Sequence, residues 1–418
     1  MSFESSVVWI RDTLVPRMLE VVPMWKGATV IKCEIAQMAI NKDGFASLLF
    51  SVDLWLNCDG KRTSDSIIVK IMFFDDKLRA AFQSEKQFAN EIHFYSKVLP
   101  LFESVAGAQL LFPRYYYSSI SSSPEGKCRE EDAVIVMEDL RPKGFRLGNR
   151  SSLDFDHCVL ALKQIGRFHA LSYAMKHLDE EAFHRDVVSK ILETLNSSEF
   201  SSGIGAYNKR VTEALKTLSP ENSLAETLQG KVTDPKIFEN LITPKEPLAV
   251  LCHGDFCRNN MLFNYDEKNK VCDVRLLDLQ TIRYASPAID LSFFLFMNTT
   301  AELRKQSWDQ LFESYHKEVC GTLAKVLGKP EESLDPCYSL EAFKEDFRQH
   351  ALYGYIITVT FLPCMLGSDQ EREEMTRSWQ ESFWDVEHMQ DLIDRIGGVQ
   401  ATDALVSLVL EMREKSFL

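Results

Sequence analysis

The alternation of apolar and polar positions predicts a sheet-rich beginning to the chain. Residues 28–56 contain two extended runs around "NKDGFASLLF", and "SIIVKIMFF" (66–74) is a third. Short apolar runs bounded by Gly, Asn and Asp are typical of β-strands. A helix is predicted next, in "RAAFQSEKQFANEIHFYSKVL", where Phe88, Ile92 and Tyr95 recur at helical spacing. This part therefore reads as a small sheet that carries one long helix.

After one more buried strand, "AVIVMEDL" (133–140), the pattern becomes mainly helical. A strong helix is predicted over residues 154–177, with Ser151 and Ser152 as candidate N-caps. Apolar positions recur along it at the spacing of one helix face. The second part of the chain is therefore dominated by helices.

Two short strands, 247–252 and 273–279, interrupt the helical part and flank a polar motif. A sheet followed by many helices is typical of an α+β fold. We therefore predict a bilobal α+β protein with a smaller N-terminal lobe over 1–140, a linker at about 134–140 and a larger helical lobe over 141–418.

Composition and charge exclude several classes of function. The chain has 418 residues, of which 45% are hydrophobic and 26% charged, as in ordinary globular proteins. Its net charge of −14 disfavours nucleic acid and anionic membranes as partners. No apolar run reaches the length of a membrane span, and the N-terminus lacks a signal-peptide pattern. Ten scattered cysteines without a CxxC pair indicate free thiols, so we expect a cytoplasmic protein.

The polar motif "LCHGDFCRNNMLF" (251–263) places Asp255 five positions before Asn260, and Asp278 follows in "VRLLDLQ". Phosphoryl transfer needs an acceptor for the proton of the substrate hydroxyl, together with oxygen ligands for Mg²⁺. We therefore predict Asp255 as the base and Asn260 and Asp278 as metal ligands. Taken alone, "HGD" is also compatible with an ordinary turn after a strand.

Lys70 lies within the apolar run "IIVKIMFF", where an unpaired ammonium group would be costly to bury. Glu91 is the predicted partner, because it follows Phe88 by three positions on the buried side of the next helix. Glu85 is the competing partner on the same helix. A Lys–Glu pair of this kind holds the α and β phosphates of ATP in kinases. The alternative is a lysine on an edge strand with its ammonium group in water.

Two segments are candidates for further nucleotide contacts. In "NKDGFASLL" (41–49), Gly44 could form a hairpin tip whose backbone covers the phosphates, or an ordinary Asp-Gly turn. In "VIVMEDL", backbone groups of Met137, Glu138 and Asp139 would contact the adenine edge. This second assignment follows from position along the chain and not from side-chain chemistry.

Four other polar residues are interpreted mainly as structural. His169 falls on the apolar face of its helix and is expected as a hydrogen-bonded core histidine. His253 precedes the catalytic turn and is predicted to bond to neighbouring backbone. Arg258 could contact substrate or form an exposed ion pair. Asp290 opens an apolar helix and could cap it or accept backbone N–H bonds from the catalytic loop.

Taken together, "VLCHGDFCRNNMLF", "VRLLDLQTIRYASPAIDLSFF", "SIIVK", "NEIHFY" and "VIVMEDL" resemble the ecdysteroid kinase-like family, which is akin to choline kinases and aminoglycoside phosphotransferases. The likeness covers roughly residues 25–300. It implies a protein-kinase-like fold, ATP and Mg²⁺ as cofactors, and phosphorylation of a small-molecule alcohol. By position it assigns the same roles to the five charged and polar side chains already described. Two departures are Leu279, where many relatives carry an aromatic residue, and a phosphate loop poor in glycine.

The acceptor alcohol is less constrained. The family name suggests an ecdysteroid or a similar steroid or xenobiotic, and an apolar pocket for it could be walled by Phe293, Phe294, Phe296, Tyr353, Tyr355, Phe361, Trp379 and Trp384. Core packing is the commoner role of such aromatic residues. Residues 301–418 carry 22 acidic and 12 basic side chains, which would favour a cationic alcohol such as choline or an aminoglycoside.

Two other classes remain as alternatives. A pseudokinase-like ligand-binding protein would keep the fold without turnover, but such proteins usually lose a metal ligand, and both predicted ligands are present. A protein kinase is disfavoured because Asp290 follows Asp278 by only twelve positions. That spacing leaves little room for a loop that binds a peptide substrate.

Overall fold

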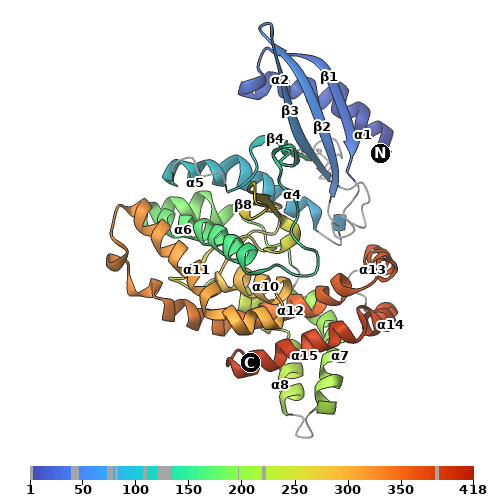
Figure 1. Ribbon diagram of the computed structural model, residues 1–418, viewed down its shortest axis with the longest axis vertical. Coiled ribbons are helices and arrows are strands. Elements are labelled where there is room, and N and C mark those ends of the chain that lie inside the picture. The colour runs from blue at the N-terminus through green and yellow to red at the C-terminus, as the bar shows by residue number, and fades with distance from the viewer. Residues whose placement is uncertain are drawn as a thin grey trace.

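The structure is a computed structural model that describes residues 3–38, 47–72, 79–80, 83–106, 111–120, 133–195, 197–218, 223–381 and 386–418. A sheet-rich N-terminal part sits on a larger helical part (Figure 1). The predicted α+β class, with a small sheet-rich lobe and a mostly helical C-terminal lobe, is therefore confirmed.

The N-terminal lobe is built on a five-stranded antiparallel sheet with the order β1-β2-β3-β5-β4. Its strands are β1 (Thr29–Gln37), β2 (Ser47–Cys58), β3 (Lys61–Met72), β4 (Tyr115–Ser119) and β5 (Val134–Glu138). Side chains alternate between the two faces of a strand, so Val69 faces one side of β3 and Lys70 the other. Lys70 is paired in register with Ile135 of the central neighbour β5. This register excludes the edge-strand interpretation of Lys70.

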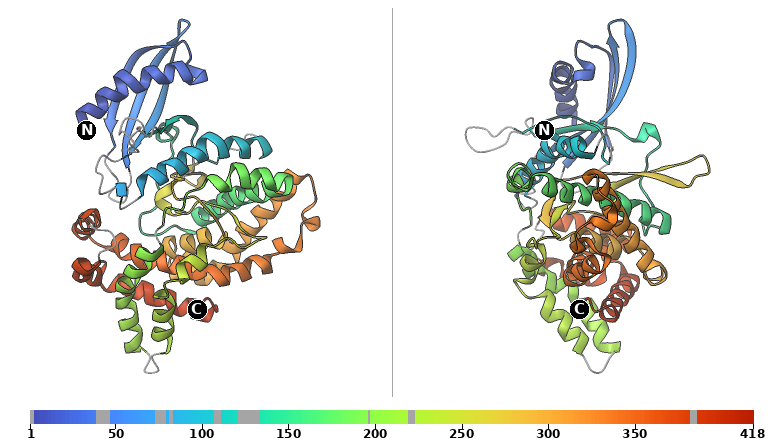
Figure 2. Two further views of the ribbon diagram at one scale, coloured as in Figure 1. Left: turned by 180° about the vertical axis from the view of Figure 1, so that it is seen from behind. Right: turned by 90° about the vertical axis from the view of Figure 1, so that its left-hand side faces the viewer.

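One face of the sheet is covered by an N-terminal helical segment that the sequence pattern did not predict (Figure 2). It consists of α1 (Phe3–Trp9), a short π-helical stretch (Ile10–Leu14) and α2 (Val15–Val21). Leu14 and Met18 are 1% exposed and belong to one hydrophobic cluster with Val52 and Val69 of the sheet. Together with the long helix described next, this segment covers both faces of the sheet with helices.

The opposite face is covered by the predicted long helix, which lies between the sheet and the helical lobe (Figure 1). It is continuous from α4 (Ser84–His93) through a π-helical stretch (Phe94–Val98) to α5 (Leu99–Ala106). Phe88 and Tyr95 are fully buried in the larger hydrophobic core. This position brings α4 close to the face of the sheet from which Lys70 projects.

The helical lobe begins with α6 (Phe155–Asp186), whose N-cap is Asp154. The Asp154 carboxylate accepts a hydrogen bond of 3.0 Å from the backbone N–H of His157, so the predicted caps Ser151 and Ser152 were placed a few residues too early. The remaining helices are α7 (Ser197–Leu218), α8 (Ser223–Val232), α9 (Ile237–Ile242), α10 (Ala288–Asn298), α11 (Ala301–Leu327), α12 (Leu340–Leu366), α13 (Asp369–Glu381), α14 (Gln390–Arg395) and α15 (Gly398–Glu414).

Two small antiparallel sheets interrupt the helices and carry the polar motifs. In one, β6 (Val250–Cys252) pairs with β9 (Arg283–Ala285), and in the other β7 (Met261–Tyr265) pairs with β8 (Val271–Leu276). The loops that leave β6 and β8 contain Asp255 and Asp278 respectively. Within the described ranges, no helix combines the length and the apolar character needed to cross a bilayer.

Candidate active site

The turn after β6 is held in place by hydrogen bonds to Asp290, which lies in the first turn of α10. One carboxylate oxygen of Asp290 accepts the backbone N–H of His253 at 2.7 Å, and the other accepts that of Gly254 at 2.9 Å. Asp290 is fully buried and also bonds to Nε2 of His169 at 3.1 Å. Of the two roles considered for Asp290, the structure therefore shows the one in which it braces the loop.

Gly254 is required by the shape of this turn. Its φ of +82° lies in the left-handed region, which L residues with a side chain seldom adopt. A Cβ atom at this position would lie 1.9 Å from the backbone oxygen of Thr281. The glycine therefore allows the turn to pack directly against the chain that follows Asp278.

Asp255 and Asn260 form a contact across the turn. The amide group of Asn260 donates to the Asp255 carboxylate at 2.7 Å and to the Asp255 backbone oxygen at 3.0 Å. Burial and repulsion from Asp278 raise the pKa of Asp255, while His253 and the hydrogen bond from Asn260 act in the opposite direction. A raised pKa makes a carboxylate a better proton acceptor, so the environment suits a general base.

The loop after β8 is tied to the loop after β6 through backbone groups. The N–H of Leu277 donates to the backbone oxygen of Asn260 at 2.9 Å, and Nε2 of His253 bonds to the Leu277 oxygen at the same distance. The predicted role of His253 as a scaffold residue agrees with this contact. Asp278 follows with a φ of +63°, in the left-handed region, and its carboxylate contacts Lys70.

Lys70 is the point at which the two lobes meet. Its Nζ lies 2.6 Å from a Glu91 oxygen and 2.7 Å from an Asp278 oxygen. Lys70 is 5% exposed and Glu91 is fully buried, whereas the competing candidate Glu85 is exposed on α4. The structure thus brings together Lys70, Glu91 and Asp278, which lie far apart in the sequence.

Burial and ion pairing act in opposite directions in this cluster. Burial alone would lower the pKa of Lys70, but the carboxylates of Asp278 and Glu91 outweigh it and hold the pKa above its ordinary value. Burial raises the pKa of Glu91 to about 7, against the attraction of Lys70. The two carboxylates therefore favour the charged form of Lys70, and a buried charge acts more strongly on a phosphate than an exposed one.

The oxygen donors beside Asp255 fit a hard divalent cation. Among the described residues, the hydrogen bonds of the Asn260 side chain use its amide nitrogen, so its amide oxygen could coordinate a metal. Asp278 uses one carboxylate oxygen for Lys70, and its side chain is 29% exposed and so partly accessible to a cation. Amide and carboxylate oxygens are the ligands that Mg²⁺ prefers. These two residues would hold the ion.

The linker between the lobes uses part of its backbone within the sheet. Met137, Glu138 and Asp139 are all less than 10% exposed. The N–H of Glu138 donates to the Arg114 oxygen at 2.8 Å, and that of Asp139 donates to the Ser66 oxygen at 2.9 Å. These two amides are therefore already used within the protein, and an adenine contact in this segment would have to use its other backbone groups. Gly44 and the expected hairpin tip lie outside the described residues.

His169, Cys252 and Asp290 lie close enough together to resemble a metal site, but their bonds indicate a structural role. Nδ1 of His169 is 2.9 Å from the hydroxyl of Tyr315, and its other ring nitrogen faces Asp290. Burial raises the pKa of the Cys252 thiol, and a protonated thiol is a poor ligand. His169 is the hydrogen-bonded core histidine that the sequence predicted.

The position of Arg258 differs from one of the two predictions made for it, that of an exposed side chain. It is 3% exposed, and its Nη1 lies 3.5 Å from the sulfur of Met365 in α12. Its backbone N–H donates to the side chain of Asn298 at 3.0 Å. The expected exposure of Arg258 is therefore wrong, because the side chain packs inward against α12.

Two buried polar residues at the site were given no role by the sequence analysis. Oε1 of Gln280 accepts a bond from Lys70 Nζ at 3.3 Å, and Asn90, next to Glu91 on α4, bonds to backbone groups of Leu192 and Gln280. The position of Gln280, two residues after Asp278, was the only available signal for it. No sequence signal pointed to a role for Asn90, because a polar residue on an amphipathic helix is usually solvated.

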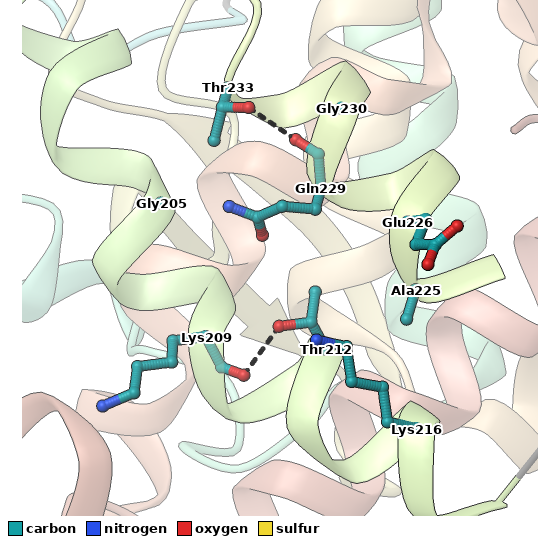
Figure 3. A pocket seen from close by; sticks show the side chains of 9 residues that line it. All are labelled: Gly205, Lys209, Thr212, Lys216, Ala225, Glu226, Gln229, Gly230 and Thr233. Atoms are coloured by element: carbon teal, nitrogen blue, oxygen red, sulfur yellow. Dashed lines mark hydrogen bonds between the residues drawn. The ribbon is translucent and has the colours of Figure 1, made fainter. Parts of the chain in front are cut away.

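A groove of about 540 Å³ lies between α7 and α8, away from these residues (Figure 3). Its lining includes Lys209, Lys216, Glu226 and Gln229 and none of the predicted site residues. The residues around Lys70 and Asp255 are favoured as the functional site on chemical grounds, because they combine buried charge, shifted pKa values and oxygen donors.

A sequence profile of the ecdysteroid kinase-like family matches residues 41–328 of the chain. A comparison with curated proteins finds no match. Among solved structures, a similar chain is the GDP complex of a mutant aminoglycoside 2′-phosphotransferase-IIIa. It is 13% identical, with 91% of this chain and 99% of that chain covered and a TM-score of 0.41.

Proposed function

Because the chain belongs to the ecdysteroid kinase-like family and is thus a small-molecule phosphotransferase with a hydroxyl acceptor, we propose that it transfers the γ-phosphoryl group of ATP, with Mg²⁺, to an apolar alcohol. An ecdysteroid or a similar steroid or xenobiotic is the proposed acceptor. The observation that carries the proposal is the contact of Lys70 with both Glu91 and Asp278, next to the Asp255–Asn260 pair.

In the proposed mechanism each side chain has one task. Lys70, oriented by Glu91, binds the α and β phosphates of the nucleotide. Asp255 accepts the proton of the acceptor hydroxyl, and Asn260 keeps its carboxylate oriented. Asn260 and Asp278 would hold Mg²⁺, which neutralises charge on the phosphates when it is bound. The linker at Met137 to Asp139 would contact adenine through backbone groups other than the amides of Glu138 and Asp139.

The choice of an apolar acceptor is supported by family membership more than by the aromatic residues. Of the eight aromatic residues considered as a pocket wall, six are less than 10% exposed and pack in the core: Phe293, Phe294, Phe296, Tyr353, Tyr355 and Trp379. Phe361 is half-buried on α12, and Trp384 lies outside the described residues. The excess of acidic side chains over residues 301–418 supports a second candidate, a cationic alcohol of the choline or aminoglycoside type.

A panel of acceptors tests the proposal. Purified protein is incubated with ATP and Mg²⁺ and with an ecdysteroid, a sterol, a plant phenolic, choline or an aminoglycoside, and the products are identified by mass. We expect a phosphorylated product from a hydroxylated steroid or phenolic. A product only from choline or an aminoglycoside would favour the second candidate. Nucleotide binding without any product from the panel would favour the pseudokinase-like alternative.

The substitution Asp255→Asn tests the role of the base. It should lower kcat by at least about a hundredfold, because an amide cannot accept the hydroxyl proton. Nucleotide affinity measured by calorimetry should stay unchanged, because Asp255 acts on the acceptor. The matched control is Asp273→Asn, which removes a part-exposed carboxylate on β8 away from the site. An Asp255→Asn variant with wild-type turnover would exclude this role.

A further inference from the structure

Asn90 is a buried polar residue whose side chain, within the described part of the chain, bonds to backbone groups outside the five residues of the proposed mechanism. It is fully buried and precedes Glu91 on α4. Successive helical residues point about 100° apart, so Glu91 can face Lys70 while Asn90 faces a different neighbour. That neighbour is the connection between α6 and α7, which comes from the other lobe.

The contacts of Asn90 form a clamp between three segments. Its Nδ2 donates to the Leu192 oxygen at 2.8 Å, and its Oδ1 accepts the Leu192 N–H at 2.8 Å. The same Nδ2 donates to the Gln280 backbone oxygen at 3.2 Å. An Asn side chain has two donor hydrogens, and both are used here. One side chain thus joins α4 to the α6–α7 connection and to the loop that carries Asp278.

The α6–α7 connection is itself fixed from two sides. Lys86 of α4 donates to the Glu193 backbone oxygen at 3.3 Å. Arg283, which is 2% exposed, bonds to the Glu193 carboxylate at 3.3 Å and to the hydroxyl of Tyr353 in α12 at 3.0 Å. Leu192 therefore belongs to a segment that is anchored to the helical lobe and can act as a fixed support for α4.

In protein kinases the helix that carries the glutamate can move, and its position decides whether the Lys–Glu pair forms. Here we infer that Asn90 is a positioning residue, which holds α4 in the orientation where Glu91 meets Lys70, with the Leu192 backbone as its anchor. This inference rests on the proposed role of the Lys70–Glu91 pair in nucleotide binding. It places the control of that pair in the helical lobe, at a connection that is not part of the catalytic motifs.

The test compares two buried asparagines. Asn90→Ala should weaken binding of ATP with Mg²⁺ about tenfold by calorimetry, because each bond lost from the clamp favours other orientations of α4. The control is Asn208→Ala on α7. Asn208 is also fully buried, and it bonds to Tyr355 and Gln229 at 2.6 Å and 2.8 Å. It should cost similar thermal stability and leave nucleotide affinity unchanged. Equal affinities in both variants would overturn the inference.

Combining Asn90→Ala with Glu91→Gln separates positioning from general stability. Glu91→Gln alone should weaken nucleotide binding, but in the Asn90→Ala background its further effect should be small, because the pair is already misaligned. Fully additive effects would contradict the inference. If Asn90→Ala does not fold, Asn90→Leu keeps roughly the same side-chain size and removes the hydrogen-bonding groups without adding a charge, and it is expected to give the same loss. If Lys70→Met leaves nucleotide binding intact in the wild-type chain, the proposed function fails, and not the clamp alone.

Discussion

Asp290 is the residue whose charge connects stability to pH most directly. Burial alone would raise its pKa, but the bonds from His169 and the backbone N–H groups of the catalytic turn outweigh it, so the pKa lies below its ordinary value of 3.8. A carboxylate that accepts several N–H bonds in a buried position is more stable ionised than protonated. The turn that holds Asp255 is therefore strongest when Asp290 carries its charge.

The substitution Asp290→Asn should lower the free energy of unfolding by about 3 kcal/mol at neutral pH, because it removes one partner from a buried charged network. Since the folded pKa is below the unfolded one, the stabilisation from Asp290 is fully present above about pH 4 and is lost as the pH falls through the folded pKa. The difference in the free energy of unfolding between wild type and variant should become smaller in acid, as measured by urea unfolding between pH 7 and pH 3. The exposed Asp309→Asn is the control, and a difference that does not change with pH would contradict the prediction.

At the residue scale, the sequence was informative where a charged side chain lies among apolar neighbours and would cost free energy to bury without a partner. A lysine inside an apolar run needs an anion, and this reasoning led to Glu91, the residue that Lys70 contacts. The same reasoning could not show that Asp278 would be a second anion for Lys70, because 208 positions separate the two residues. The clamp at Asn90 was also invisible, since its partners are backbone groups, which every residue has.

At the scale of elements, the face of the sheet opposite α4 depends on the N-terminal helices. Met18 on α2 is 1% exposed and packs against residues of β2 and β3. The sequence pattern did not reveal this segment, because α1 and α2 have only seven residues each and a π-helical stretch between them shifts the helical period. Longer elements such as α6 kept their period and were predicted.

The substitution Met18→Ala should destabilise the protein by about 2–5 kcal/mol, because it leaves a cavity between α2 and the sheet. Val21→Ala on the same helix is the matched control, since Val21 is 52% exposed and should cost less than about 0.5 kcal/mol. Thermal unfolding measures both. Nucleotide affinity should be unchanged in each variant, because Lys70 projects from the other face of the sheet. Equal stability of the two variants would mean that α2 is not a structural part of the lobe.

At the scale of the whole molecule, the site exists only where the two lobes meet. Lys70 comes from the sheet, Glu91 from α4 and Asp278 from the loop after β8 in the helical lobe. A ligand that engages all three should stabilise both lobes together, because it binds only the assembled protein.

ATP with Mg²⁺ should therefore raise the melting temperature, and at a hundred times Kd the stabilisation should be about 2.7 kcal/mol. Chelation of the metal with EDTA should remove most of the shift, since Asn260 and Asp278 are the proposed ligands. Lys70→Met should remove it as well, while Lys344→Met, which changes a partly exposed lysine on α12, should not. An equal shift with and without EDTA would exclude a metal-dependent mode of binding.

The sequence by itself determined the fold class, the family and the residue types of the site, because these depend on periodicity and on local motifs such as "HGD". Only the tertiary structure decided which glutamate meets Lys70, that the amides of Glu138 and Asp139 are used within the sheet, and that most aromatic residues of the helical lobe are core. The physical reason is that burial and hydrogen bonding are properties of neighbours in space. Those neighbours are brought together from distant parts of the chain by packing, and no local pattern records them.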